Sequence, residues 1–363
     1  MKIYGYTTTR NCINMSYPFE ESILNHLDFC DHVVVVDTSD GSDATVERLD
    51  NLVNQVNQVG ADRLSVYHLD ADYNVPNFPL LDGRTKALAR SLCKNADYLW
   101  QFDVDEAVMP GSRKAIESFI NMCFTENSYD VFTLPVVEFW GSSVDEKGHA
   151  KVRVDVNPWK ERVSRNNVQV IHGAPANKMK HEKSVEDGRY YDFMCPGTDG
   201  CNYISSDQHQ LVPVGHAYMT NEVEDCRRAA LNGDELSLKV YQAWLNKLIE
   251  DSAVPVVFHY SWWSVYHKML GYEKYWNKFW LAAYNEKRPE GWNPFSDKPL
   301  NEMTDQEKRE LATRLETETG GHIFHTQWKG QKTPHANVTC QGPEDMVKWY
   351  TNRNELSSAK DSD

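Results

Sequence analysis

The sequence predicts an α/β protein built on a doubly wound mixed sheet, and three observations carry this prediction. Strand-like and helix-like stretches alternate through most of the first 105 residues. Residues 32–36 are an almost continuous valine run, which is typical of a parallel strand covered on both faces. A second apolar strand, at 98–102, runs directly into a group of acidic residues. Because ligands of such sheets bind at the carboxyl ends of strands, we expect a functional site there.

The elements of the first part follow from the spacing of apolar residues. The first helix, for example, has Ile23, Leu24 and Leu27 on one face and Glu20 and Glu21 near its start, where the helix dipole favours acids. The strands are short, apolar and rich in β-branched residues. The predicted strands are 2–8, 32–36, 64–69 and 98–102, and the predicted helices are 18–28, 44–59 and 84–94.

The second part of the chain is less regular. A loop-rich region with several short strands is expected over 141–215, and an aromatic-rich helix over 261–284. We expect one domain over 1–260 and a helical extension over 261–363 that ends in a disordered tail. The remaining predicted elements are helices at 113–124, 221–251 and 304–317 and strands at 131–139 and 254–260.

Composition argues against several classes of protein. The 363 residues carry a net charge of −15 and no visible basic stripe, so a nucleic-acid partner is not expected. No apolar run reaches the roughly 18 residues of a membrane span, and no signal peptide opens the chain. The eight cysteines include no C-x-x-C pair, which argues against a zinc knuckle. We therefore expect a protein of a reducing compartment, the cytoplasm.

The acidic group after the 98–102 strand consists of Asp103, Asp105 and Glu106. Neighbouring carboxylates repel one another and lose hydration when packed, so they need a compensating cation. Hard oxygen ligands suit Mn²⁺ or Mg²⁺, and these ions in turn hold phosphates. Asp37 follows the valine strand at the same edge of the sheet and is expected to converge on this site. A solvated acidic turn is the alternative, because D-x-D is a short motif.

The order and spacing of several motifs resemble glycosyltransferase family 2. The motifs are Arg-Asn at residues 10 and 11, D-T-S-D-G-S-D-A-T over 37–45, G-R-T-K-A over 83–87, and D-V-D-E over 103–106. The resemblance covers about residues 1–140 and weakens toward 280. It implies a GT-A fold with a nucleotide-sugar binding half over 1–140 and an acceptor half over 141–260. It also implies sugar transfer from a UDP- or GDP-sugar to a glycan, lipid-linked or protein acceptor.

The same resemblance implies roles for individual residues. Asp103 would contact the ribose or the sugar, and Asp105 would bind Mn²⁺ or Mg²⁺, which offsets the charge of the leaving diphosphate. Asp37 would face the nucleoside. The full set expected to bind the donor is Arg10, Asp37, Ser39, Asp40, Arg84, Lys86 and Asp103.

Enzymes of this kind often take a further metal ligand from the C-terminal half. The candidate is His259, in a V-F-H-Y-S-W segment that resembles the H-Y-x-W of bacterial and phage relatives. Imidazole suits Mn²⁺. His216 is the second choice and His172 a distant third. A core or surface histidine is the alternative explanation.

The catalytic base of an inverting enzyme is a carboxylate within hydrogen-bond reach of the acceptor hydroxyl. Asp199, in a Gly-flanked loop of the acceptor half, is slightly favoured over Glu138, which ends a strand; Asp192 is a further candidate. A solvated loop acid or a helix cap is the alternative explanation for each.

Aromatic and basic residues suggest two further contacts. The tryptophans that are candidates for stacking on a sugar, or else for simple core packing, are Trp140, Trp159, Trp262 and Trp263. The predicted 261–284 helix also carries Lys268, Lys274 and Lys278, which suggests a peripheral membrane contact.

Two other functions remain open from the sequence. A nucleotide-sugar nucleotidyltransferase usually has a Gly-rich loop after its first strand, but residues 7–14 contain no glycine. A non-catalytic carbohydrate-binding protein on an inactive transferase fold is the second alternative, and the intact Asp103 and Asp105 argue against it.

Overall fold

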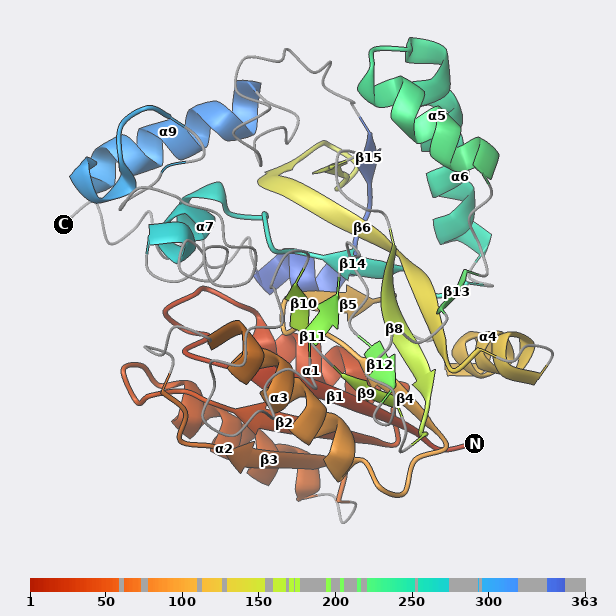
Figure 1. The fold of residues 1–363 in the computed structure, drawn as a ribbon. Helices are drawn as coiled ribbons and strands as arrows, with labels where there is room; N and C mark the ends of the chain where they lie inside the picture. The colour runs from red at the N-terminus through yellow and green to blue at the C-terminus, as the bar shows by residue number, and fades with distance from the viewer. Residues whose placement is uncertain are drawn as a thin grey trace.

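The computed structural model of the chain confirms the α/β class. A mostly parallel sheet lies at the centre of the lower part of Figure 1, and a second group of strands and helices lies above it. The structure describes residues 1–349 except 59–61, 73–77, 110–112, 126–128, 154–158, 168–169, 173, 177–193, 197–202, 206–213, 217–220, 252–253, 274–292, 294–295 and 319–337; residues 350–363 are also outside the description.

The parallel part of the sheet is formed by the first four strands, in the order β4-β1-β2-β3. All four predicted strands are confirmed, and helix α3 begins at Phe78 rather than at residue 84. The bounds are β1 Ile3–Thr9, α1 Phe19–Leu27, β2 His32–Asp37, α2 Thr45–Asn57, β3 Leu64–His68, α3 Phe78–Leu92 and β4 Tyr98–Gln101.

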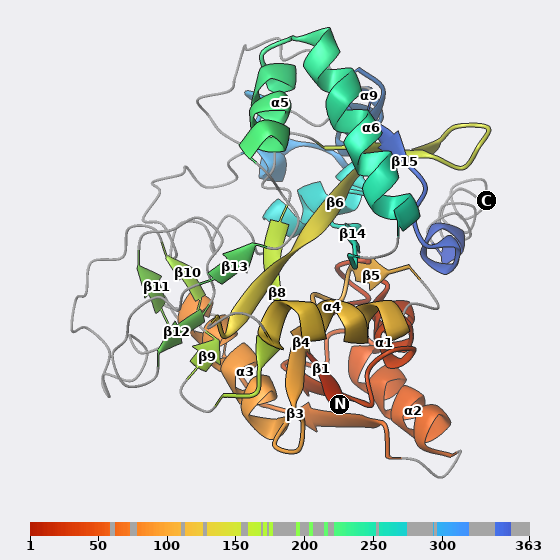
Figure 2. The same ribbon diagram turned by 90° about the vertical axis from the view of Figure 1, so that its right-hand side faces the viewer.

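Strand β2 is buried on both faces because helices cover both sides of the sheet (Figure 2). Val33 and Val35 belong to the apolar core that includes residues of α1 and α2. Val34 and Val36 pack in a separate cluster with residues of α3. The valine run thus fills both sides of a doubly covered strand, and it places Asp37 at the carboxyl edge of the sheet.

The remaining elements extend the sheet and build the second half. Helices α5 and α6 form an antiparallel pair away from the parallel strands (Figure 1). The bounds are β5 Glu106–Val108, α4 Arg113–Thr125, β6 Val131–Val144, β7 Ala150–Val152, β8 Trp159–Arg165, β9 Val170–His172, β10 Ala174–Ala176, β11 Met194–Pro196, β12 Tyr203–Ser205, β13 Val214–His216, α5 Asn221–Leu231, α6 Glu235–Asp251, β14 Val257–His259, α7 Val265–Gly271, η3 Leu300–Glu302, α9 Asp305–Glu318 and β15 Thr339–Cys340.

Strand β8 is antiparallel to both β4 and β6 and contains a β-bulge. Phe132 lies opposite Val163, whereas its neighbour Thr133 lies opposite Glu161. Arg162 is therefore the extra residue. A bulge bends the strand and redirects its side chains, so Arg162 departs from the regular alternation of β8.

Strand β14 joins the two halves of the molecule. It pairs antiparallel with β5 and parallel with β6. His259 therefore lies opposite Glu106 on one side and opposite Glu138 on the other. Strand pairing alone brings together a histidine and two acids that are far apart in the sequence.

Helix α7 begins at Val265, so the helix expected over 261–284 starts later than predicted. The side chain of Ser264 accepts a hydrogen bond from the His267 backbone and caps the helix. Glu316 of α9 accepts a second one from the Val265 backbone, at 3.0 Å. The cap and this contact fix the start of α7 directly after the β14 segment.

The tryptophans around this segment are core residues. Trp140 and Trp262 stack with ring centroids 5.4 Å apart, and both are buried, as is Trp263. The proposal that these three stack on a sugar is therefore wrong. Lys268 is also buried, so it does not face a membrane. Within the described residues, no helix has the length and apolar character needed to span a bilayer.

Candidate active site

The loops after β1 and β2 are bound to each other at the carboxyl edge of the sheet. Arg10 donates from Nη1 to the Thr38 carbonyl at 2.5 Å and from Nη2 to Asp40 at 3.1 Å. The Asn11 backbone donates to Ser39 Oγ at 2.9 Å. Asn11 has a φ of 43°, a left-handed conformation that is costly for a residue with a side chain and is often found at functional sites. Arg10, Ser39 and Asp40 are thus brought together, as expected.

Asp37 is the buried centre of this edge. Its Oδ1 accepts hydrogen bonds from Thr9 and Ser39, both at 2.7 Å, and its Oδ2 lies 3.0 Å from His68 Nδ1. His68 Nε2 lies 3.1 Å from Asp50. Burial would lower the pKa of His68, but the two carboxylates raise it. Protein groups therefore occupy both oxygens of Asp37, and its contact with a nucleoside stays a prediction.

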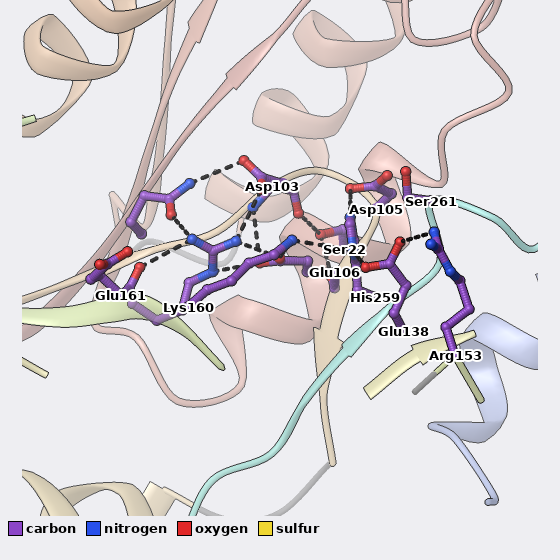
Figure 3. Close-up of polar contacts among 12 residues, drawn as sticks. Ser22, Asp103, Asp105, Glu106, Glu138, Arg153, Lys160, Glu161, His259 and Ser261 are labelled. Carbon is purple, nitrogen blue, oxygen red and sulfur yellow. Dashed lines mark hydrogen bonds and ion pairs between the residues drawn. The ribbon is translucent and has the colours of Figure 1, made fainter. Parts of the chain in front are cut away.

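Arg162 is the centre of a buried ion-pair cluster at the end of β4. Its guanidinium contacts both carboxylate oxygens of Glu106, at 2.9 and 2.5 Å, and Asp103 at 3.0 Å. Lys86 lies 3.4 Å from the other oxygen of Asp103, to which Gln101 donates at 3.1 Å. Figure 3 shows Asp103 and Glu106 within one network of polar contacts. We call Arg162, Asp103, Glu106 and Lys86 the Asp103 cluster.

The Asp103 cluster supplies its own compensating cations. The side chains of Arg162 and Glu106 are 2% and 0% exposed, so neither charge reaches water. Burial would raise the pKa of Asp103, but Lys86 and Arg162 outweigh it and hold that pKa well below its usual range. A buried pair of this kind is stable only with good geometry, and the two-pronged contact of Arg162 with Glu106 provides it.

His259 is the centre of a second cluster, which includes Asp105, the acid two residues after Asp103. Its Nε2 lies 3.3 Å from Asp105 Oδ1, and its Nδ1 lies 3.3 Å from Glu138 Oε2. Lys160 lies 3.2 Å from the same Nδ1, and Arg153 lies 3.3 Å from the other oxygen of Glu138 (Figure 3). We call these five residues the Asp105 cluster. The expected pairing of Asp105 with His259 is thus present in the structure.

Charges within the Asp105 cluster shift the pKa values of its members. Burial and Lys160 would lower the pKa of His259, but Asp105 and Glu138 raise it to about 9. Burial would raise the pKa of Glu138, but His259 and Arg153 lower it well below its usual range. A carboxylate stabilised in this way is a weak proton acceptor. Glu138 therefore suits the orientation of His259 better than the role of catalytic base.

The Asp105–His259 pair has the chemistry of a divalent-metal site. Its 3.3 Å separation is close to the roughly 3 Å between adjacent ligands with bonds of about 2.1 Å. Glu138, behind the imidazole, completes the carboxylate–histidine arrangement that commonly orients a metal-binding histidine. In the part of the chain that the structure describes, no set of three or more His, Cys, Asp or Glu side chains has metal-holding geometry.

Glu161 is a second buried glutamate and was not expected from the sequence. It is 6% exposed, and its Oε2 has no hydrogen-bond partner in the described structure. Burial raises the pKa of Glu161 to about 7. Figure 3 places Glu161 at the end of the network opposite to Arg153.

Five further candidates complete the predicted set. Arg84 is half-buried on α3. Asp192 and Asp199 lie outside the described residues. His172 and His216 lie in β9 and β13, but their side chains are outside the description. Their roles stay predictions.

Sequence reasoning missed most of the cations. Lys160 and Arg162 lie in β8, in which four of the seven residues are charged, and this density of charge was the available signal. Arg153 and Lys268 belong to no motif. Each is recognised only when the tertiary structure places it beside the acids.

Comparison with known proteins gives similarity of structure only. No family profile and no curated protein sequence matches the chain. Similar solved structures include S. aureus TarS 1-349 in complex with UDP, with 16% identity, a TM-score of 0.32, and coverage of 69% of this chain and 72% of that one. Another TarS 1-349 structure has 17% identity and a TM-score of 0.33, covering 78% and 81% of the two chains.

A third similar structure is a CMP:2-keto-3-deoxy-manno-octonic acid synthetase complexed with CTP. It has 9% identity and a TM-score of 0.26, and the match covers 46% of this chain and 76% of that one. At such low identities and TM-scores, we transfer no activity and no residue role from these proteins.

Proposed function

We propose that this chain is a metal-dependent glycosyltransferase of the GT-A type. It would move a sugar from a nucleotide-sugar donor to a hydroxyl acceptor such as a glycan, a lipid-linked sugar or a protein. The observation that carries the proposal is the Asp105–His259–Glu138 arrangement, with 3.3 Å contacts on both sides of the imidazole. It lies directly after a parallel strand, where ligands of α/β sheets bind.

Asp105 and His259 would hold Mn²⁺ or Mg²⁺, and Glu138 would orient the imidazole through Nδ1. When bound, the ion supplies Lewis-acid chemistry that offsets the negative charge of a departing nucleoside diphosphate. Coordination requires the neutral imidazole, so the metal and a proton compete for His259. Mg²⁺ in proteins is commonly held by one or two carboxylates together with phosphate oxygens of the substrate.

The protein side chains would position the donor on either side of this pair. The Arg10–Asp40 loop pair would bind the nucleotide, and Asp103, held in one orientation by Arg162, would accept a hydrogen bond from a ribose or sugar hydroxyl. Because Glu138 is engaged with His259, we retain Asp199 as the proposed base. The cytoplasmic location and the division of the chain at residue 260 remain part of the proposal.

The test is a thermal-shift titration of the protein with UDP, GDP, CMP and TDP, each with and without Mn²⁺. A ligand at about 100-fold excess over its dissociation constant stabilises the folded state by roughly 2.7 kcal/mol. We expect one nucleotide to raise the Tm only with Mn²⁺, and this shift to disappear in Asp105→Asn. If no nucleotide shifts the Tm, the proposed donor site is wrong.

The alternatives give different outcomes. A nucleotidyltransferase would transfer the nucleotidyl group of a nucleoside triphosphate to a sugar or sugar phosphate, and pyrophosphate would leave from the triphosphate. A carbohydrate-binding protein would bind a glycan equally well as wild type and as Asp105→Asn. Hydrolysis or transfer of the donor sugar, measured in the presence of Mn²⁺, separates the transferase from both.

A further inference from the structure

A small hollow lies beside the Asp105 cluster, between the loop before α1 and the segment that follows β14. Three serines and one lysine, Ser16, Ser261, Ser264 and Lys268, are among the residues that line it, and Met15, Tyr17, Tyr260 and His267 complete the lining. Its volume of about 10 Å³ accommodates one water-sized group. The hollow therefore suits a single oxygen atom rather than a ring.

Lys268 is the charged residue of this hollow. It is 9% exposed, and its Nζ hydrogen-bonds to Ser261 Oγ. The ammonium also lies 5.3 Å from the centre of the Trp262 ring, so an aromatic face and a hydroxyl together fix its position. A lysine held this far from water is costly unless negative charge lies near it.

Lys268 interacts electrostatically with the acids Asp105 and Glu138 and with the basic residues Lys160 and Arg153 of the Asp105 cluster. Burial lowers the pKa of Lys268 to about 8, while Asp105 and Glu138 act in the opposite direction. The Tyr260 backbone donates to the Asp105 carbonyl at 2.8 Å, which ties the hollow to the acidic motif. Lys268 thus lies within electrostatic reach of the proposed metal site and lines an oxygen-sized space.

The opposite wall of the hollow has an unusual backbone. Ser16 is 8% exposed and has a φ of 57°, in the left-handed region that residues with a side chain rarely adopt. Such strain persists when the surrounding structure fixes it, and it is concentrated at ligand sites. Ser16 and Ser261 thus present hydroxyl groups from two segments that are far apart in the sequence.

We propose that this hollow binds a phosphate oxygen of the donor's diphosphate, with Lys268 as the cation and Ser16 and Ser261 as hydrogen-bond donors. The inference rests on the proposed function, because the diphosphate is that of the nucleotide-sugar. A metal on Asp105 and the ammonium of Lys268 would contact the diphosphate from two sides. Lys268 would then stabilise the leaving group in addition to binding the donor.

The experiment compares the affinities of a nucleoside diphosphate, the matching monophosphate and the nucleoside by calorimetry with Mn²⁺. In wild type the diphosphate should bind more tightly than the monophosphate. In Lys268→Met this preference should fall at least tenfold, with nucleoside affinity unchanged, and Lys268→Arg should retain part of it. Lys239→Met, at an exposed position of α6, is the matched control and should behave as wild type.

Two further variants separate binding from folding. Ser261→Val fills the hollow and removes a hydrogen bond of Lys268 without changing charge, and it should reduce the diphosphate preference; a cooperative melting transition shows that the variant is folded. Ser16→Ala should reduce it less. If folded Lys268→Met and Ser261→Val both keep the wild-type preference, the inference is wrong.

Inorganic pyrophosphate with Mn²⁺ tests the hollow independently of the nucleoside. Wild type should bind it, and Lys268→Met should bind it at least tenfold more weakly. Pyrophosphate binding without nucleotide binding would reject the donor proposal but retain the phosphate site. Equal pyrophosphate affinity in the two proteins would overturn the site even if nucleotides bind.

Discussion

Asp103 and Asp105 are separated by one residue, yet they lie in two different electrostatic environments. Asp103 belongs to a cluster in which Arg162 and Lys86 balance the acids. Asp105 contacts a histidine, whose charge depends on pH and whose nitrogen can bind a metal instead of a proton. One short acidic motif therefore contains two kinds of site. Asp103 is held in an ion pair with Arg162, whereas the partner of Asp105 is a histidine that can exchange a proton for a metal ion.

The largest change in the free energy of unfolding should come from removing the central cation of the Asp103 cluster. Arg162→Met removes the cation that contacts both oxygens of the buried Glu106 and leaves only Lys160, 3.6 Å away; loss of one partner of a buried pair typically costs about 3–5 kcal/mol. Chemical denaturation should show this loss in the free energy of unfolding. Arg165→Met, in the same strand but half-buried, is the matched control and should cost much less. Equal losses in the two variants would contradict a special role for the buried pair.

The second prediction separates the two aspartates. Asp105→Asn should lower Mn²⁺-dependent nucleotide affinity by about 100-fold or more, equivalent to roughly 2.7 kcal/mol, because it removes a proposed metal ligand. Asp103→Asn should weaken nucleotide binding about tenfold but leave its Mn²⁺ dependence intact. Calorimetry with and without Mn²⁺ measures both. A loss of Mn²⁺ dependence in Asp103→Asn alone would reverse the assignment.

The third prediction compares the two buried glutamates. The pKa of Glu161 is raised from 4.5 to about 7, so the folded state binds a proton more tightly than the unfolded state. The stability of the protein therefore falls as pH rises from 4.5 to 7. Glu161→Gln removes this penalty and should stabilise the protein by about 3 kcal/mol at pH 8, at roughly 1.4 kcal/mol per pKa unit.

At pH 4.5 the Glu161→Gln variant and wild type should have nearly equal free energies of unfolding. Denaturation curves across this range provide the measurement, and Glu138→Gln is the contrasting variant. It should be destabilised at pH 7, because the pKa of Glu138 is lowered rather than raised. A pH-independent difference between Glu161→Gln and wild type would rule out the assigned shift.

The smallest effect concerns the second cation of the Asp103 cluster. The Lys86–Asp103 pair is partly exposed, at 22% and 33%. Water screens such pairs, so Lys86→Met should change the free energy of unfolding by less than about 1 kcal/mol. Thermal denaturation measures this difference. A loss as large as that of Arg162→Met would show that both cations are equally essential.

The sequence predicted the parallel strands and much of the site because these depend on local patterns. The valine run requires cover on both faces, and Asp103 and Asp105 directly follow a buried strand, so their positions were expected. His259 was expected because it follows an apolar strand in a family-like segment. Each of these inferences uses residues close together in the sequence.

The rest of the site depends on contacts that local patterns do not encode. Glu138 faces His259 only because β6 and β14 are parallel neighbours. Arg162 reaches the acids only because β8 pairs with β4 and carries an extra residue. Trp140 and Trp262 are of a residue type that often stacks on sugars, but here they stack on each other in the core. The positions of Glu138 and Arg162 in the site therefore depend on pairing between strands that are distant in the sequence.

The bulge in β8 shifts the alternation of side chains between the two faces of the sheet by one residue. Residues on its two sides follow alternations that are out of step by one position, with Val163 on one side and Glu161 on the other. Deleting Arg162 would remove a charge and would make the pairing with β6 regular, while Glu161 and Val163 would keep the faces that they have opposite Thr133 and Phe132. The extra residue therefore adds a buried cation beside the acids without changing the faces of the residues on either side of it.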